Sequence, residues 1–191
     1  VRGFAERLAR PPGVPLIGGE TAEMPGVLRP GAREVVGALF GLPPAEAGLA
    51  GAAGRPCLVF SMDGVGTKTK LGVLARSTGG LALDIIHHSL NDILCLGAAG
   101  LGLLFYVGCH RREEKLLAGF RDAAMQACAR LGLSVLALQT AEKPGTYLPG
   151  EIDVCAAVAG AVGEKRLLQG AEVRAGDVLV VFSHSGRSRS V

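Results

Sequence analysis

Two stretches of the chain repeat their apolar residues at the three- and four-residue spacing of an amphipathic helix. The first runs from Leu81 to Leu96. The second runs from Glu113 to Leu131 and is followed by Gly132, a common helix stop. Shorter apolar runs, bounded by glycine, proline and polar residues, are typical of strands and lie at 14–17, 34–42, 57–60, 101–107, 133–138, 152–162 and 177–182. Together these elements predict a mixed α/β domain.

Each predicted helix has one apolar face that we expect to be buried. On the first helix this face consists of Leu83, Ile86, Leu90, Ile93 and Leu94, and on the second it consists of Leu116, Leu117, Phe120, Ala124, Ala127 and Leu131. A neighbouring sector of the first helix is polar, because Asp84, His88, Asn91 and Asp92 recur at spacings of four, seven and eight residues. We interpret the tandem pair His87-His88 as ordinary helix histidines, one near the sheet and one near solvent.

The composition is that of a globular domain with a sizeable core: 191 residues, of which 49% are hydrophobic and 19% are charged. A net charge of +3 and the absence of Trp do not indicate a nucleic-acid partner. No apolar stretch is long and continuous enough to cross a bilayer, so we expect no membrane partner. The five cysteines are odd in number and lack a C-x-x-C pair. We therefore expect neither a zinc site nor a disulfide framework, and a reducing, cytoplasmic location.

The stretch Asp63-Gly64-Val65-Gly66-Thr67-Lys68 follows the apolar run at 57–60 and carries the most chemistry. Gly64 and Gly66 let backbone N–H groups approach an anion closely, because neither has a Cβ atom. Lys68 supplies a positive charge for phosphate, and Asp63 supplies a hard oxygen for Mg²⁺. The spacing is not that of a Walker A loop. From these residues alone, a plain glycine turn at a strand end is the commoner case and stays open.

The chain also contains an internal repeat. Residues 21–31 and 140–150 share the pattern Thr-Ala-Glu-x-Pro-Gly-x-x-x-Pro-Gly without a gap. The preceding Gly18-Gly19-Glu20 becomes Ala137-Leu138-Gln139 in the second copy, which has therefore lost both glycines and the leading carboxylate. Two accounts are open. Residues 1–42 are the tail of a first copy in a tandem duplication, or they form an N-terminal arm whose Glu20 takes the place that Gln139 cannot fill.

Several of these motifs together resemble the N-terminal domain of the AIR synthetase family, the phosphoribosylformylglycinamidine cyclo-ligases of purine biosynthesis. The family's D-G-V-G-T-K stretch matches residues 63–68 in full, and its G-G-E-T-A-E-M-P-G stretch matches residues 18–26 in full. Its helical Asp, followed seven and eight residues later by Asn-Asp, matches Asp84, Asn91 and Asp92. In one departure, the intact carboxylate loop precedes D-G-V-G-T-K, whereas the family has it afterwards.

The resemblance implies a fold and a domain organisation. The fold is an α/β (α+β) domain with a mostly antiparallel sheet backed by two main helices, and it pairs through that sheet into a homodimer. Residues 43–191 would form this domain and residues 1–42 an arm carrying the duplicated carboxylate loop. We expect the family's C-terminal domain to be absent from the chain.

The resemblance also implies an activity: ATP-dependent conversion of formylglycinamidine ribonucleotide to aminoimidazole ribonucleotide. Asp63, Asp92 and Glu20 would hold Mg²⁺, and Lys68, Asp92 and Glu20 would be catalytic. The phosphates of ATP would be bound by Asp63, Gly64, Val65, Gly66, Thr67, Lys68 and Asn91. Two alternatives are open: another ATP-dependent phosphoryl-transfer enzyme of the same superfamily, and a non-catalytic dimerising remnant.

Overall fold

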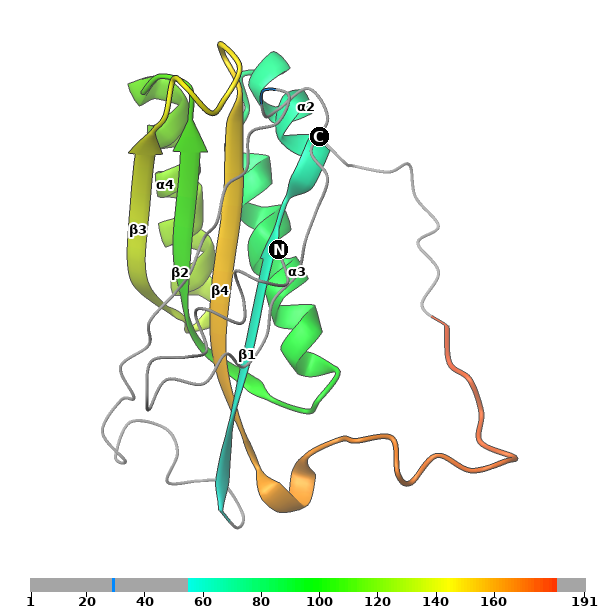
Figure 1. The fold of residues 1–191 in the computed structure, drawn as a ribbon. Coiled ribbons are helices and arrows are strands. Elements are labelled where there is room, and N and C mark those ends of the chain that lie inside the picture. The colour runs from blue at the N-terminus through cyan, green and yellow to red at the C-terminus, as the bar shows by residue number, and fades with distance from the viewer. Residues whose placement is uncertain (1–28, 30–54, 182–191) are drawn as a thin grey trace, which may run out of the picture.

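The computed structural model describes residue 29 and residues 55–181, which fold into a mixed α/β domain (Figure 1). The strands predicted at 14–17 and 34–42 lie outside the described residues. The elements follow one another as β1 (Pro56–Gly64), the 3₁₀ turn η1 (Gly66–Lys68), α2 (Thr69–Leu74), α3 (Gly79–Leu94), β2 (Ala99–Cys109), α4 (Glu114–Leu131), β3 (Ser134–Glu142), β4 (Ile152–Gly163) and the 3₁₀ turn η2 (Glu164–Arg166). The two main helices and four of the predicted strands are therefore confirmed, each within a few residues.

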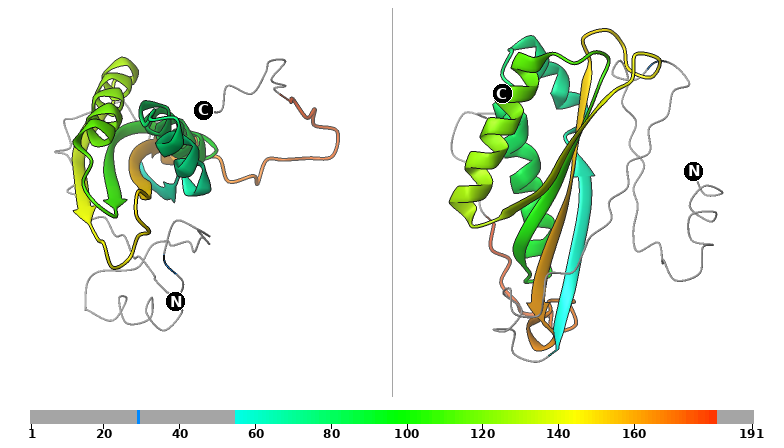
Figure 2. Two further views of the ribbon diagram at one scale, coloured as in Figure 1. Left: turned by 90° about the horizontal axis from the view of Figure 1, so that it is seen from above. Right: turned by 90° about the vertical axis from the view of Figure 1, so that its left-hand side faces the viewer.

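The four strands form one sheet in the order β1-β4-β2-β3. β4 is antiparallel to both of its neighbours, β1 and β2, whereas β2 and β3 run parallel and are connected by α4. The sheet is thus mostly antiparallel, as expected. Figure 2 shows α3 and α4 together on one face of this sheet. α3 contacts β1 and β4, and α4 contacts β3, so each helix covers one edge of the sheet.

The core lies between the two helices and the sheet face that they cover. Phe105 of β2 and Phe120 of α4 meet there in an edge-to-face contact, with ring centroids 5.8 Å apart. Burial raises the pKa of the Cys128 thiol on α4, which keeps this group protonated as part of the packing. The other large, fully buried aliphatic side chains are Leu81, Ile85, Ile86, Ile93, Leu103, Val107, Val154 and Val158.

Close packing of α3 on the sheet depends on a glycine in β4. A Cβ atom at Gly160 would lie 2.7 Å from Ile93 Cδ1 of α3 and 2.9 Å from the Ala99 carbonyl oxygen. A side chain at this position would therefore displace the Ile93 side chain and meet the backbone of β2. At the far end of α4, Gly132 has the left-handed conformation (φ 69°) that ends the helix, as predicted.

The predicted apolar faces are right in part. On α3, Ile86 and Ile93 are buried, but Leu83 and Leu94 are 37% and 63% exposed. The buried stripe is instead centred on Ala82, Ile85, Ile86, Ser89 and Ile93. Successive helical residues are rotated by about 100°, so apolar residues beside this stripe point to solvent. On α4, the terminal Leu131 is likewise 46% exposed.

The strand predicted at 177–182 is wrong over the residues that the structure describes. Residues 177–181 are not in a strand, and Val178 and Leu179 are 86% and 87% exposed. The apolar run is present, but no described strand lies beside it, and a strand needs a neighbour to satisfy its backbone hydrogen bonds. No helix in the described part of the chain has the length and apolar character needed to span a membrane.

Candidate functional site

β1 ends in the glycine-containing loop that the sequence singles out. Gly66 has the left-handed conformation (φ 71°), which glycine adopts without strain. The chain then turns through η1 into α2, and the Thr69 hydroxyl donates a 3.0 Å hydrogen bond to the Gly66 carbonyl. Nothing lies within 4 Å of a Cβ atom built on Gly66, so backbone conformation rather than crowding requires glycine here.

Two amides of this loop already have acceptors within the protein. The Gly64 N–H group donates to Asp63 Oδ1 at 2.6 Å, and the Val65 N–H group donates to the Val154 carbonyl at 2.9 Å. In this arrangement neither is directed at an incoming anion. The Gly64 bond has another consequence: it fixes the Asp63 carboxylate through one oxygen and leaves Oδ2 facing α3.

Lys68 is held against the polar side of α3. Its ammonium lies 2.6 Å from Asp84 Oδ2, and the two side chains are 38% and 40% exposed. A pair this exposed contributes only about 0–1 kcal/mol, because water screens both charges. Lys68 is therefore oriented by Asp84 without being tightly bound to it, and its charge remains available to a phosphate.

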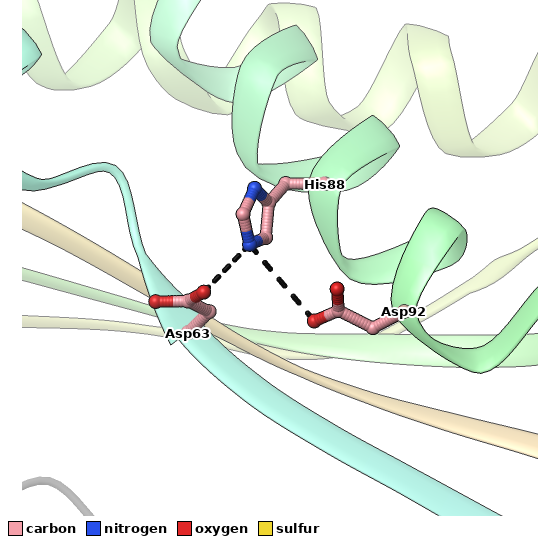
Figure 3. A group of neighbouring side chains, drawn as sticks. All are labelled: Asp63, His88 and Asp92. Carbon is pink, nitrogen blue, oxygen red and sulfur yellow. Dashed lines mark hydrogen bonds and ion pairs between the residues drawn. The ribbon is translucent and has the colours of Figure 1, made fainter. Parts of the chain in front are cut away.

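Asp63, His88 and Asp92 converge where the end of β1 meets α3 (Figure 3). His88 Nε2 lies 2.6 Å from Asp63 Oδ2 and 3.9 Å from Asp92 Oδ2. Asp92 is one helical turn beyond His88, and such i,i+4 pairs share a helix face. The Ser61 hydroxyl donates to Asp92 Oδ2 at 2.7 Å, which fixes this carboxylate from β1. Two carboxylates and an imidazole thus share one partly exposed site, which we call the β1–α3 cluster.

The other predicted site residues are not part of this cluster. Asn91 and Thr67 are exposed. Glu20 lies outside the described residues. Gln139, its counterpart in the second copy of the repeat, is on β3 at the opposite edge of the sheet.

The comparisons with known proteins bear on which family this domain represents. A family model described as "AIR synthase related protein, N-terminal domain" matches residues 45–162. The chain belongs to this family. Its resemblance to the AIR synthetase N-terminal domain is thereby confirmed, and so is the expected fold class.

Two relatives of this AIR synthase related chain share a name. The phosphoribosylformylglycinamidine cyclo-ligase of Symbiobacterium thermophilum is 38% identical over 165 residues, covering 83% of this chain and 44% of that protein. The protein of the same name from Alkaliphilus metalliredigens is 35% identical over 150 residues, covering 78% of this chain and 42% of that protein. The chain therefore spans less than half the length of these two relatives.

Solved structures of low identity also resemble this AIR synthase related domain. T. maritima PurL complexed with FGAR covers 63% of this chain and 19% of its own, with 14% identity and a TM-score of 0.49. Thiamine-monophosphate kinase from Stenotrophomonas maltophilia K279a covers 59% and 33%, with 15% identity and a TM-score of 0.46. At these scores the likeness carries no argument about ligands.

His88 is the residue that sequence reasoning left out of the site. The pair His87-His88 was interpreted as ordinary helix histidines, and His87 fits that description: it is exposed, and its Nδ1 contacts the Leu83 carbonyl oxygen at 2.7 Å. His88 instead lies against Asp63. The signal available in the sequence was the i,i+4 spacing between His88 and Asp92, which placed both on one helix face.

Proposed function

We propose that the chain is the N-terminal part of an ATP-dependent phosphoribosylformylglycinamidine cyclo-ligase. The observation that carries this proposal is the meeting of Asp63 and Asp92, from two separate family motifs, in the β1–α3 cluster. Relatives at 35–38% identity bear the cyclo-ligase name. Because the chain covers less than half of those relatives, the full activity would need a C-terminal domain in addition.

The two carboxylates of the cluster fit the magnesium ion that accompanies ATP. Carboxylate oxygens are the ligands that Mg²⁺ prefers, and it commonly takes one or two from the protein and the rest from phosphate and water. Asp63 and Asp92 would hold the ion here, joined in our proposal by Glu20 from the arm. When bound, Mg²⁺ would neutralise part of the negative charge on the triphosphate.

The chain's own residues would position the nucleotide. Lys68 would exchange its contact with Asp84 for one with a phosphate oxygen and so stabilise the charge that develops during phosphoryl transfer. Ser61 and the Gly64 N–H group hold the two carboxylates in place before ATP arrives, which lowers the entropic cost of binding. Asn91, exposed one residue before Asp92, would contact the nucleotide or its ion.

The proposed substrate is formylglycinamidine ribonucleotide, and the proposed product is aminoimidazole ribonucleotide. Transfer of the γ-phosphoryl group to the substrate's amide oxygen would create a leaving group, which the substrate's own amine then displaces to close the ring. Such chemistry requires positioning and charge neutralisation more than a covalent enzyme intermediate. The reaction belongs to a biosynthetic enzyme of the cytoplasm.

A homodimer formed through the sheet is part of the proposal. Both main helices lie on one sheet face, so the opposite face is left without a helix among the described residues (Figure 2). Met62 follows the alternation of β1 and points away from Asp63 and α3, and it is 38% exposed. A second copy pairing on this face would bury it. Sedimentation velocity of the full chain would detect a species of twice the monomer mass, and a purely monomeric chain at high micromolar concentration would contradict the dimer.

Calorimetric titration of the full chain with ATP and Mg²⁺ tests the function. We expect saturable binding that Glu20→Ala abolishes, whereas Gln139→Ala leaves the affinity unchanged. The absence of binding to the parent chain would favour a non-catalytic remnant. Ring closure is then assayed with formylglycinamidine ribonucleotide in a form of the protein that includes the C-terminal domain. Nucleotide binding without ring closure would indicate a different phosphoryl-transfer enzyme.

A further inference from the structure

His88 brings a nitrogen atom of the kind that binds metals into the β1–α3 cluster. One ligand atom from each of Asp63, His88 and Asp92 can be chosen so that all three lie within 4.8 Å of one another. Ligands of one ion at bonds of about 2.1 Å lie about 3.0 Å apart in octahedral geometry and about 3.4 Å apart in tetrahedral geometry. The observed 2.6 Å and 3.9 Å separations from His88 Nε2 fall on either side of these values. The third separation, between the two carboxylate oxygens, is at most 4.8 Å, so side-chain rotations that draw the three atoms together would let them share one ion.

The charge balance of the cluster favours a dication. Asp63 and Asp92 together carry two negative charges, and Lys68 is engaged with Asp84. Within the described residues, His88 is the one basic side chain at ion-pairing distance from either carboxylate. A divalent cation would neutralise both carboxylates at once.

The surroundings of the cluster suit a site with an open coordination position. The Asp63, His88 and Asp92 side chains are 29%, 52% and 38% exposed, so water or a phosphate oxygen can reach an ion held between them. The two carboxylates are each fixed by a further hydrogen bond, one from the Gly64 N–H group and one from the Ser61 hydroxyl. Such supporting bonds orient the ligands of metal sites.

We propose that Asp63, His88 and Asp92 bind one divalent cation directly, and that the imidazole makes this site select a first-row transition metal such as Mn²⁺ over Mg²⁺. Imidazole is a ligand for transition metals, whereas Mg²⁺ is usually bound by oxygen atoms alone. The Nε2 proton that donates to Asp63 would move to Nδ1, so that the Nε2 lone pair faces the metal. The inference rests on the proposed function for its two carboxylate ligands and adds His88 and the class of metal.

The test is a titration of the full chain with Mn²⁺ alone, without nucleotide, followed by electron paramagnetic resonance. Mn²⁺ is a better probe than Zn²⁺, because the exposed Cys95 thiol would compete for Zn²⁺. Pulsed spectra of the bound ion should contain the ¹⁴N coupling of a coordinated imidazole. His88→Ala should remove this coupling and weaken Mn²⁺ binding at least about tenfold, with little effect on Mg²⁺ binding.

His87→Ala is the matched control, because His87 is the adjacent exposed histidine and its Nδ1 contacts the Leu83 carbonyl oxygen of the same helix. It should keep both the nitrogen coupling and the Mn²⁺ affinity. His88→Gln, which keeps a side chain of similar length, replaces His88→Ala if that variant does not fold.

Absence of nitrogen coupling in the parent chain, or equal Mn²⁺ affinities of the parent and the His88 variant, would overturn the inference. Either result leaves the proposed function standing, since no nucleotide is present in the titration. Conversely, a chain that binds Mn²⁺ through His88 but does not bind ATP supports this site and counts against the proposed function.

Discussion

The two edges of the sheet, β1 and β3, carry different side chains at the same level of the sheet. Gly64 of β1 is paired with Cys155, Cys155 with Tyr106, and Tyr106 with Gln139 of β3, so Gly64 and Gln139 lie in one row across the sheet. Three strand spacings separate them, which is about 14 Å. At the β1 edge, carboxylates converge with an imidazole. At the β3 edge, an amide stands where the first copy of the repeat has Glu20.

The second copy of the repeat, residues 140–150, makes a different contact. Glu142 of the second copy accepts a hydrogen bond from the Arg112 N–H group at 2.9 Å. It therefore contacts the residues that precede α4 and is not part of the β1–α3 cluster. At the β3 edge the motif's Glu142 binds a backbone amide, whereas the side chains at the β1 edge are directed at one shared point. The predictions below test this contrast.

The largest effect is expected from Asp92→Asn. The amide oxygen still accepts the Ser61 hydrogen bond, so folding should be little changed, but one of the two cluster charges is lost. We expect divalent-cation and ATP affinity to fall about 100-fold, equivalent to about 2.7 kcal/mol. Calorimetry measures both. Glu142→Gln at the other edge is the matched control and should bind like the parent, and a comparable loss in this control would remove the contrast between the edges.

A second substitution tests the packing of α3 on the sheet. Gly160→Ala places a methyl group 2.7 Å from Ile93 of α3 and against a backbone oxygen. We expect a loss of about 1–3 kcal/mol in the free energy of unfolding, because Ile93 must change its side-chain position and the methyl group still meets a backbone oxygen of β2. Urea denaturation followed by circular dichroism measures it. The control is Gly145→Ala, where nothing lies within 4 Å of the added methyl group and little change is expected. Equal stability of the two variants would contradict the close packing.

The contact between Lys68 and Asp84 predicts a smaller effect of opposite sign. If Lys68 leaves Asp84 to contact a phosphate, Asp84→Asn should raise ATP affinity by a factor of about 1.4 to 5, because about 0.2–1 kcal/mol of pairing no longer opposes the exchange. Lys68→Ala should lower the same affinity. A loss of affinity in Asp84→Asn would mean that Asp84 itself supports the nucleotide, and calorimetry distinguishes the two signs.

Local sequence rules were sufficient for the elements but not for all of their contacts. The 3.6-residue periodicity located α3 and α4, and Gly132 marked a helix end, since these features depend on neighbouring residues alone. The buried stripe of α3 was displaced because periodicity does not tell which of two adjacent apolar rows faces the sheet. Asp63 and Asp92 were chosen through the family motifs. His88 was missed because its partner Asp63 lies 25 residues away on another element.

The smallest effect is expected from a substitution at the β3 edge, which tests the contrast between the two edges directly. Gln139→Glu restores to β3 the carboxylate that the first copy of the repeat has at Glu20. Within one domain the new charge lies about 14 Å from the row position of Gly64, beyond direct contact with an ion held by Asp63. Screening at physiological ionic strength, where the Debye length is about 8 Å, reduces its remaining influence. Mn²⁺ and ATP affinities should therefore change by less than about twofold.

A clear gain in affinity would mean that the β3 edge does reach a cation site. In that case the site would be at the β1 edge of a second copy in the proposed dimer. Repeating the titration across protein concentrations separates these cases, because a gain that depends on dimerisation should disappear on dilution.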